Sequence, residues 1–365
     1  MNIKKCLWLF FLCFLSAPSI QAQRNYIDIP NYILCINSYA ESTPWSTRMI
    51  STISEYVQKD PQLALYAEHM NTFMIDNDSI LKEFKNMLSQ KYTQPHPRLL
   101  VLLGSPAFTL RDEYRKLWGD IPIILCSEEA FQGPHEAYLQ KQAIKSEDRT
   151  PIAQFAEPYN MVFLYSNLYL RENVQLINHI KSNIKKFIFI GDEREINLSA
   201  SLDIQNELKT KYPKIEYQFL TPQKMTTNQL LDSLYRVDPQ TTGILFASWF
   251  YKTTFAGNTS LMSNDHKLIV TTPAPIFTLN MTDITEENGG MIGGYTYNQK
   301  RYSQELVRTI SDILQGKQAR DLPFYMPSDG APIINYTTLF RKGLSPSMCP
   351  ADTLFLIVAS QNPIP

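Results

Sequence analysis

Hydrophobic and polar residues follow two alternating patterns along the chain. Short runs of consecutive apolar residues, such as Tyr32–Ile36 and Leu99–Leu103, are separated by stretches in which apolar residues recur every three or four positions. The first pattern is typical of strands buried on both faces, and the second predicts amphipathic helices. Further strands are expected at 63–67, 121–126, 161–165, 187–190, 215–220, 243–247, 268–271 and 291–295.

The helices between these strands carry boundary signals. Thr43 suits the N-cap of the first helix, Pro44 suits its first position, and Gly316 suits the C-cap of a later one. Strands that alternate with helices predict parallel sheets covered by helices. The expected fold class is therefore α/β, with two doubly wound parallel-sheet lobes joined by a hinge.

A polar, irregular stretch at 133–155 separates two series of strands and helices, and we interpret it as the crossing between lobes. The predicted units are an N-terminal α/β lobe at 23–150, a C-terminal α/β lobe at 151–320, and a proline-rich tail at 321–365. The tail is expected to return across the hinge and both lobes. Ligands of open α/β sheets bind beyond the carboxyl ends of the strands, so the expected site is the cleft between the lobes.

The N-terminus has the pattern of a secretory signal peptide. Lys4 and Lys5 precede an apolar run at 6–17, and a small residue, Ala22, marks a cleavage position. The apolar run is about a dozen residues long, which is too short for a membrane span. We therefore expect residues 1–22 to be removed and the protein to be periplasmic.

Composition and motifs exclude several classes of function. The chain has 34 Lys plus Arg and 35 Asp plus Glu, without the basic excess of a nucleic-acid-binding protein. Dinucleotide and P-loop motifs, the nucleophile elbow and the zinc-protease helix are absent, and the five histidines share no metal-ligand spacing. We therefore expect no catalytic residue, metal or cofactor, and no enzymatic activity. A Ser–His–Asp triad stays open as an alternative, because its members can be distant in sequence.

Polar and aromatic side chains follow the ends of the predicted strands, which is the arrangement a small-molecule cleft needs. The candidate ligand-binding residues are Ser38, Tyr39, Trp45, Glu68, Ser105, Ser127, Tyr165, Asn167, Asp192, Ser248, Trp249 and Tyr251. Glu128 accompanies Ser127, and Arg194 accompanies Asp192.

Three of these assignments have a competing structural interpretation. Trp45 also has the spacing of a core residue, and the segment that begins at Asp192 also resembles a solvated helix start. Trp249 belongs to three consecutive aromatic residues that cannot all pack inward, so a role in the cleft is favoured. On that interpretation, Trp249→Ala reduces affinity with little loss of fold.

Several segments together resemble a known family. They are Ile33–Tyr39 with Pro44–Trp45, Tyr66–Thr72, Ile121–Cys126, Lys186–Asp192, Gly289–Gly294 and Ile334–Leu339. Their order and spacing resemble the substrate-binding proteins of ABC transporters with the type I periplasmic binding fold. The closer resemblance is to the branch that serves as the extracytoplasmic sensor domain of bacterial histidine kinases. The family pattern has an acidic residue two places before its final tyrosine, where this sequence has Ile334.

The resemblance implies two lobes that close on a small-molecule ligand. Its leading implication is the input domain of a two-component sensor histidine kinase. The kinase would then lie outside this chain, or the chain acts alone. A free solute-binding protein of an ABC transporter is the first alternative, and an exported two-lobed enzyme is the second. The implied partners are the ligand and a membrane-bound kinase or permease, and a homodimer is an open alternative.

Overall fold

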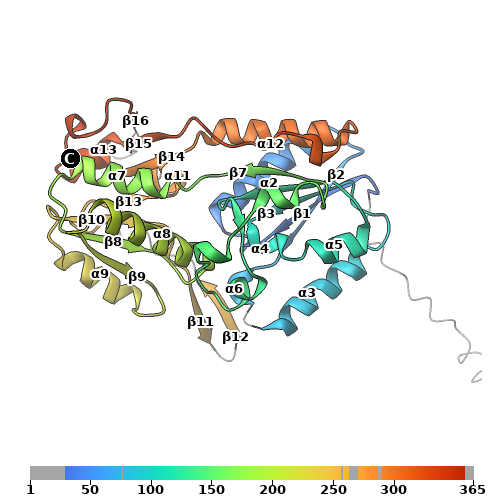
Figure 1. The fold of residues 1–365 in the computed structure, drawn as a ribbon, viewed down its shortest axis with the longest axis horizontal. Coiled ribbons are helices and arrows are strands. Elements are labelled where there is room, and N and C mark those ends of the chain that lie inside the picture. Colours follow the sequence, from blue (N-terminus) through green and yellow to red (C-terminus); the bar gives the residue numbers. More distant parts are fainter. Residues whose placement is uncertain (1–28, 76, 256–257, 263–269, 286–289, 358–365) are drawn as a thin grey trace, which may run out of the picture.

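The computed structural model describes residues 29–75, 77–255, 258–262, 270–285 and 290–357, so the predicted signal peptide lies outside the described residues. The described chain forms two α/β lobes side by side (Figure 1). Each lobe is built on its own parallel sheet, with helices on both faces. The expected α/β architecture is confirmed.

Five parallel strands form the sheet of the first lobe. Their order is β2 (Ala64–His69), β1 (Tyr32–Asn37), β3 (Leu99–Leu103), β4 (Ile123–Ser127) and β7 (Met161–Tyr165). Helices α2 (Pro44–Val57) and α12 (Gln299–Leu314) cover one face of this sheet. The helices α3 (Asp78–Lys91), α4 (Ser105–Phe108) and α5 (Arg111–Trp118) cover the other.

The strands of this sheet are buried on both faces because alternate side chains enter opposite cores. In β1, Ile33 and Cys35 pack with α2 and α12, whereas Leu34 and Ile36 pack with α3 and α5. This alternation explains why the strands appear in the sequence as continuous apolar runs.

The second lobe has a four-stranded parallel sheet in the order β13 (Phe277–Thr278), β10 (Thr242–Phe246), β8 (Lys186–Ile190) and β9 (Glu216–Leu220). Helices α7 (Leu170–Ile180) and α8 (Glu195–Lys211) cover one face, and α9 (Thr227–Arg236) covers the other. A smaller sheet of β14 (Gly293–Thr296), β15 (Ala331–Asn335) and β16 (Leu354–Leu356) adjoins α11 (Met281–Thr285) and α13 (Tyr336–Arg341).

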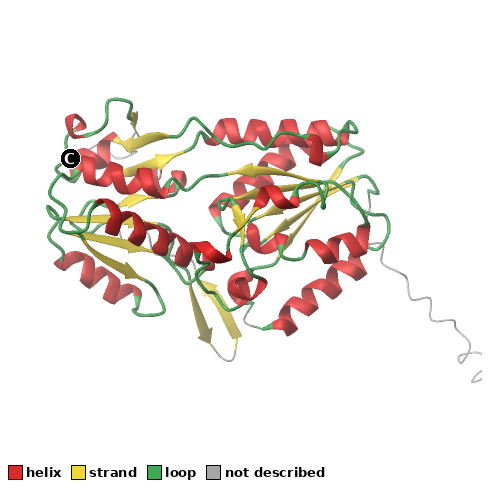
Figure 2. Cartoon of the chain, in the orientation of Figure 1, coloured by secondary structure: helices red, strands yellow, loops and turns green. Residues whose placement is uncertain are grey.

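Short elements complete the fold. The hairpin of β11 (Tyr251–Phe255) and β12 (Asn258–Met262) projects from the second lobe (Figure 2). The first lobe carries an excursion with β5 (Phe131–Gln132), α6 (His135–Leu139) and β6 (Thr150–Pro151). Single-turn 3-10 helices span Thr72–Met74, Ser146–Asp148, Ile152–Phe155, Ala319–Asp321 and Pro346–Met348.

The lobe boundary differs from the prediction at residue 150. Strand β7 pairs with β4 in the first sheet, and α12 packs on that same sheet, although both were assigned to the second lobe. The polar stretch at 133–155 is a surface excursion of the first lobe, because the chain returns after it to place β7 beside β4 in the first sheet. The chain passes between lobes after β7, after β14 and before β15 (Figure 1).

Two further differences concern the second half of the chain. The strand expected at 268–271 is not observed in its described part, since Val270 and Thr271 lie in a turn and 263–269 fall outside the described residues. The tail contacts both lobes: Tyr325 pairs with Leu164 of β7, and β15 pairs with β14. No helix among the described residues is long and apolar enough to span a bilayer.

Candidate functional site

A central cavity of about 120 Å³ lies between the two lobes. The first lobe contributes Tyr39 from the loop after β1, Trp45 from the start of α2, and Glu128 from the loop after β4. The second lobe contributes residues that follow β8, β10 and β13, namely Arg194, Asn197, Ser248, Phe250, Asn280, Thr282 and Asp283. The walls therefore come from the carboxyl ends of two facing sheets, as expected for this class of fold.

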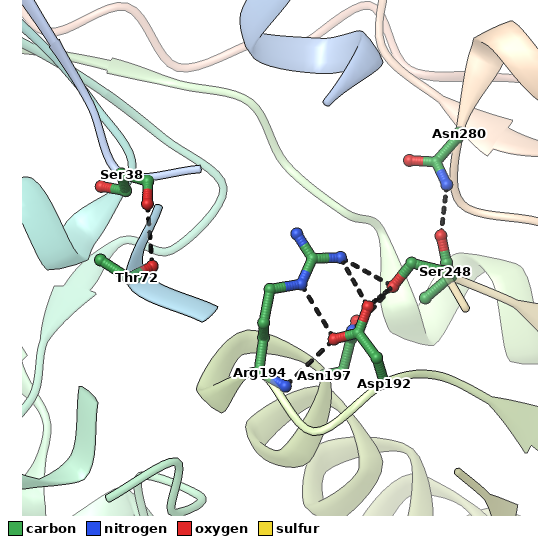
Figure 3. A network of polar contacts seen from close by, with 8 residues as sticks. Ser38, Thr72, Asp192, Arg194, Asn197, Ser248 and Asn280 are labelled. Atoms are coloured by element: carbon green, nitrogen blue, oxygen red, sulfur yellow. Dashed lines mark hydrogen bonds and ion pairs between the residues drawn. The ribbon is translucent and has the colours of Figure 1, made fainter. Parts of the chain in front are cut away.

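A buried ion pair organises the wall on the second lobe. The Arg194 side chain donates from Nε to Asp192 Oδ1 and from Nη2 to Asp192 Oδ2, both at 2.9 Å. Asp192 also accepts hydrogen bonds from Asn197 Nδ2 at 2.8 Å and from Ser248 Oγ at 2.7 Å. Figure 3 shows these four side chains converging, with Ser38 and Thr72 on the opposite lobe.

This network shifts the pKa of Asp192 in a direction that burial alone would not. Complete burial raises the pKa of Asp192, but the Arg194 charge and the hydrogen bonds from Arg194 and Ser248 outweigh it, so the pKa lies below its usual range. Asp192 is therefore a carboxylate that neutralises Arg194 and holds the guanidinium toward the cavity.

Three aromatic side chains surround the Arg194 guanidinium or face the same cavity. The guanidinium lies 5.6 Å from the Tyr39 ring centroid and 5.0 Å from that of Phe250, within range of cation–π attraction. Trp45 meets Tyr39 edge to face at 5.9 Å, and its Nε1 donates to Tyr297 Oη at 3.2 Å. The Trp45 ring is thereby fixed while it lines the cavity.

Glu128 lines the central cavity and two others. An outer cavity of about 770 Å³ is lined by the excursion of the first lobe, the β7–α7 connection and α8, and a small cavity of about 20 Å³ lies toward Tyr297. Glu128 forms no hydrogen bond or ion pair with the described residues. Burial raises the pKa of Glu128 to about 7, although Arg194 opposes this shift.

The excursion of the first lobe, which carries β5, α6 and β6, also binds to helix α8 of the second lobe beside the outer cavity. Arg149 donates to both carboxylate oxygens of Asp203 on α8, at 2.9 and 3.0 Å, and stacks on Phe131 at 4.3 Å. The Ile144 amide donates to Ser199 Oγ on the same helix at 2.9 Å. These bonds hold the lobes together on one side of the cleft.

Two buried carboxyl groups meet across the same boundary. Glu129 and Glu195 are 6% and 5% exposed, and each lies close enough to shift the pKa of the other. Burial raises the pKa of Glu129 to about 7, and burial together with the Glu129 charge raises that of Glu195 well above its usual range. One oxygen of each carboxyl group has no partner in the described structure.

These two groups predict that the protein loses stability as the pH rises. In the unfolded chain both carboxyls titrate near 4.5, so between that pH and about 7 the folded state binds more protons. The free energy of unfolding should therefore fall by about 2 kcal/mol from pH 5 to pH 7.5, measured by urea denaturation. Glu129→Gln should flatten this slope and exposed Glu83→Gln should not. A wild-type stability that rises over the same interval would contradict the assignment.

The structure distributes the predicted ligand-binding residues among several places. Tyr39, Trp45 and Ser248 line the central cavity, while Tyr165 and Asn167 line the outer one. Asp192 lies behind the central cavity as the partner of Arg194. The three predicted serines of the first lobe are buried and form hydrogen bonds within that lobe. Ser38 Oγ accepts a hydrogen bond from the Ala107 amide, and the hydroxyl groups of Ser105 and Ser127 are hydrogen-bonded to each other.

Three predicted residues lie away from the cavities. Trp249 is fully buried in the core beneath α9, and its Nε1 donates to Thr227 Oγ1 at 3.0 Å, so the favoured cleft role was wrong. Of the three consecutive aromatics, Phe250 faces the cavity, and Tyr251 begins β11 and packs on that same core. Glu68 lies on the edge strand β2 and pairs with Lys91 at 2.6 Å.

Residues outside the predicted set complete the central cavity. Glu128 and Arg194 were named beside Ser127 and Asp192, and Phe250 belongs to the aromatic run at Trp249, but none of the three was in the set of candidate ligand-binding residues. The strand-end signal therefore located their segments, and the structure decides which side chain of each segment lines the cavity. Asn280 follows β13, whose two residues are too few to be recognised as a strand in the sequence. Among the described residues, no group of three or more acidic, histidine or cysteine side chains is arranged to hold a metal ion.

Comparisons with known proteins identify the fold. No family model matches the sequence, and no curated protein matches it. Among solved structures, a conserved domain protein from Vibrio cholerae matches with a TM-score of 0.57 and 13% identity, over 89% of this chain and 99% of that one. A Streptococcus pneumoniae ABC domain in complex with L-Trp matches with a TM-score of 0.55 and 14% identity, over 89% and 99%.

A third similar structure is a subunit of a transporter. An ABC sugar transporter subunit from Rhodobacter sphaeroides matches with a TM-score of 0.50 and 8% identity, over 83% of this chain and 97% of that one. Identities this low establish the fold alone. The chain has the two-lobed α/β fold of the type I periplasmic binding proteins.

Proposed function

We propose that this protein binds a small organic molecule in the central cavity and that the ligand holds the two lobes together. The observation that carries the proposal is a cavity lined from both lobes by aromatic side chains, a neutralised arginine and an unpaired carboxyl group. A ligand that contacts both walls gains more free energy in the closed arrangement than in an open one, so binding favours closure. The similar structures include a protein bound to L-Trp and a sugar transporter subunit, which agrees with this class of function.

The biological use of this binding is the finer part of the proposal. Following the sequence resemblance, we propose that the protein is a periplasmic receptor whose closure is transmitted to a membrane-bound histidine kinase. Delivery of the ligand to a permease is the alternative. A kinase gene beside the coding gene supports the first use, and permease genes support the second.

A stability screen tests the binding function. A ligand that binds only the folded state raises its stability by about 2.7 kcal/mol at a hundredfold excess over the dissociation constant. We expect at least one sugar, amino acid, nucleoside or short peptide to raise the thermal midpoint of the purified chain. Trp45→Ala should remove this shift, and Phe340→Ala should keep it, because Phe340 is exposed on α13.

Two results would contradict this function. One is a midpoint that no compound of the panel moves. The other is chemical conversion of a bound compound during incubation, measured by mass spectrometry, which would support the exported-enzyme alternative instead.

A further inference from the structure

We infer that the ligand carries a protonated amine and that Glu128 is the counter-ion of that amine. The inference rests on the proposed binding function and adds the chemical class of the ligand. It is carried by the unpaired Glu128 carboxyl group, by the charges of the surrounding wall, and by the aromatic side chains beside it.

The charged residues around the central cavity differ in whether they have a counter-ion or a hydrogen-bond donor. Arg194 is the single cation among the described lining residues, and Asp192 neutralises it through two hydrogen bonds at 2.9 Å. The other charged lining residues are acidic. Asp283 accepts hydrogen bonds from Thr278 at 2.8 Å and Asn280 at 3.2 Å, whereas Glu128 accepts none from the described residues. The wall therefore has an excess of negative charge, with its least satisfied acceptor at Glu128.

The aromatic side chains supply a second attraction for a cation. Trp45 lines both the central and the small cavity together with Glu128. The Arg194 guanidinium already makes cation–π contacts with the rings of Tyr39 and Phe250, but no cation among the described residues lies over the Trp45 ring. An ammonium group between a carboxylate and an indole gains both an ion pair and a cation–π contact in a partly desolvated site.

Because Glu128 titrates, ion pairing with an amine should make the affinity depend on pH, which simple packing of a ligand against Glu128 would not do. With a pKa of about 7, the carboxyl group is about half protonated at neutral pH. An ammonium group beside it favours the carboxylate, so binding should release protons and affinity should rise from pH 5.5 to pH 8. The titratable groups that face Glu128 are Arg194, Glu129, Tyr39, Tyr165 and Tyr297, and Arg48 lines the small cavity with it. Arg48 stays positively charged over this interval, so its charge does not change the direction of the pH dependence. Burial raises the pKa of each of these tyrosines above its usual value, so they stay neutral over this interval.

Matched probes test the inference on the full chain. Phenethylamine, N-acetylphenethylamine, 3-phenylpropionate and L-phenylalanine all contain a phenyl ring on a two-carbon chain, and they differ in the charged or neutral groups on that chain. We expect the two amine-bearing probes to bind at least about tenfold more tightly than the acetylated probe, measured by calorimetry. L-Phenylalanine binding more tightly than phenethylamine would identify an amino acid as the source of the amine. The reverse order would identify a simple amine. Calorimetry in buffers of different ionisation enthalpy should record proton release with either amine.

Glu128→Gln separates this role from a structural one. The variant should fold with a midpoint at or above that of the wild type, because Glu128 makes no hydrogen bond and its burial opposes the charged form. It should bind the amines at least about tenfold more weakly and without proton release. Glu83→Gln, an exposed carboxyl on α3, should behave as the wild type. Equal or tighter binding of the carboxylate or acetylated probe would overturn the inference. So would binding of a sugar with no response to any amine, although that result leaves the cleft function standing. No binding by any compound of either panel would overturn both.

Discussion

Replacing Trp249 by alanine is expected to lower the free energy of unfolding by about 3–5 kcal/mol, the usual cost of truncating a buried tryptophan. The indole is 0% exposed and packs with Ile190, Leu230, Leu234 and Phe246 between the sheet of the second lobe and α9. The substitution leaves a cavity in this core and removes the hydrogen bond to Thr227. Chemical denaturation of the purified variant measures the effect.

The matched control is Phe255→Ala, which truncates an aromatic side chain that is 84% exposed on the neighbouring hairpin. This variant should stay within about 0.5 kcal/mol of the wild type. A Trp249→Ala protein that keeps its stability but loses ligand affinity would restore the cleft role that the sequence favoured. That outcome would mean that the Trp249 indole faces the cleft and not the core beneath α9.

Replacing Asp192 by asparagine is expected to cost a similar amount, about 3–5 kcal/mol, because it leaves Arg194 without its counter-charge in a buried site. Asparagine also turns one acceptor oxygen into a donor, facing groups that already donate from Arg194, Asn197 and Ser248. Ligand affinity should fall as well, because the guanidinium and Ser248 both line the central cavity. Denaturation and calorimetry on one preparation measure the two losses.

Two comparisons make this expectation specific. Adding Arg194→Met to Asp192→Asn should recover part of the lost stability, since no buried charge is then unpaired. Exposed Asp232→Asn on α9 should have little effect. The depressed pKa of Asp192 means that its contribution is present above the unfolded value and is lost as the pH falls through the folded one. The stability difference between the wild type and Asp192→Asn should therefore shrink as the pH falls through the folded pKa of Asp192. Single-variant costs that simply add in the double variant would contradict the pairing of Asp192 with Arg194.

The strands and helices could be predicted because each is encoded locally. The apolar runs at β1, β3 and β4 and the spacing in α2 and α12 appear in the sequence with nearly their observed bounds. The strand expected at 291–295 overlaps β14 of the small sheet, but β15, β16 and the β11–β12 hairpin were not predicted, because short or exposed strands carry no long apolar run.

The lobe boundary could not be predicted for a different reason. The 133–155 stretch is polar because it lies on the surface, and a surface excursion and a domain crossing have the same composition. Pairing of β7 with β4 distinguishes them, and strand pairing is a contact between distant segments. The same applies to α12, which covers the first sheet although it follows most of the second lobe.

The sequence by itself determined the α/β class, the two series of strands, and the strand ends at which a site would form. It did so because burial of a strand on both faces leaves a local apolar pattern. Only the tertiary structure decided which side chains at those ends face the cleft. Trp249 turns into a core while Phe250 faces the cavity, and Glu128 stays unpaired while Glu68 is paired with Lys91. The orientation and pairing of these side chains depend on residues far away in the chain. The two walls of the central cavity face each other only after both lobes have folded.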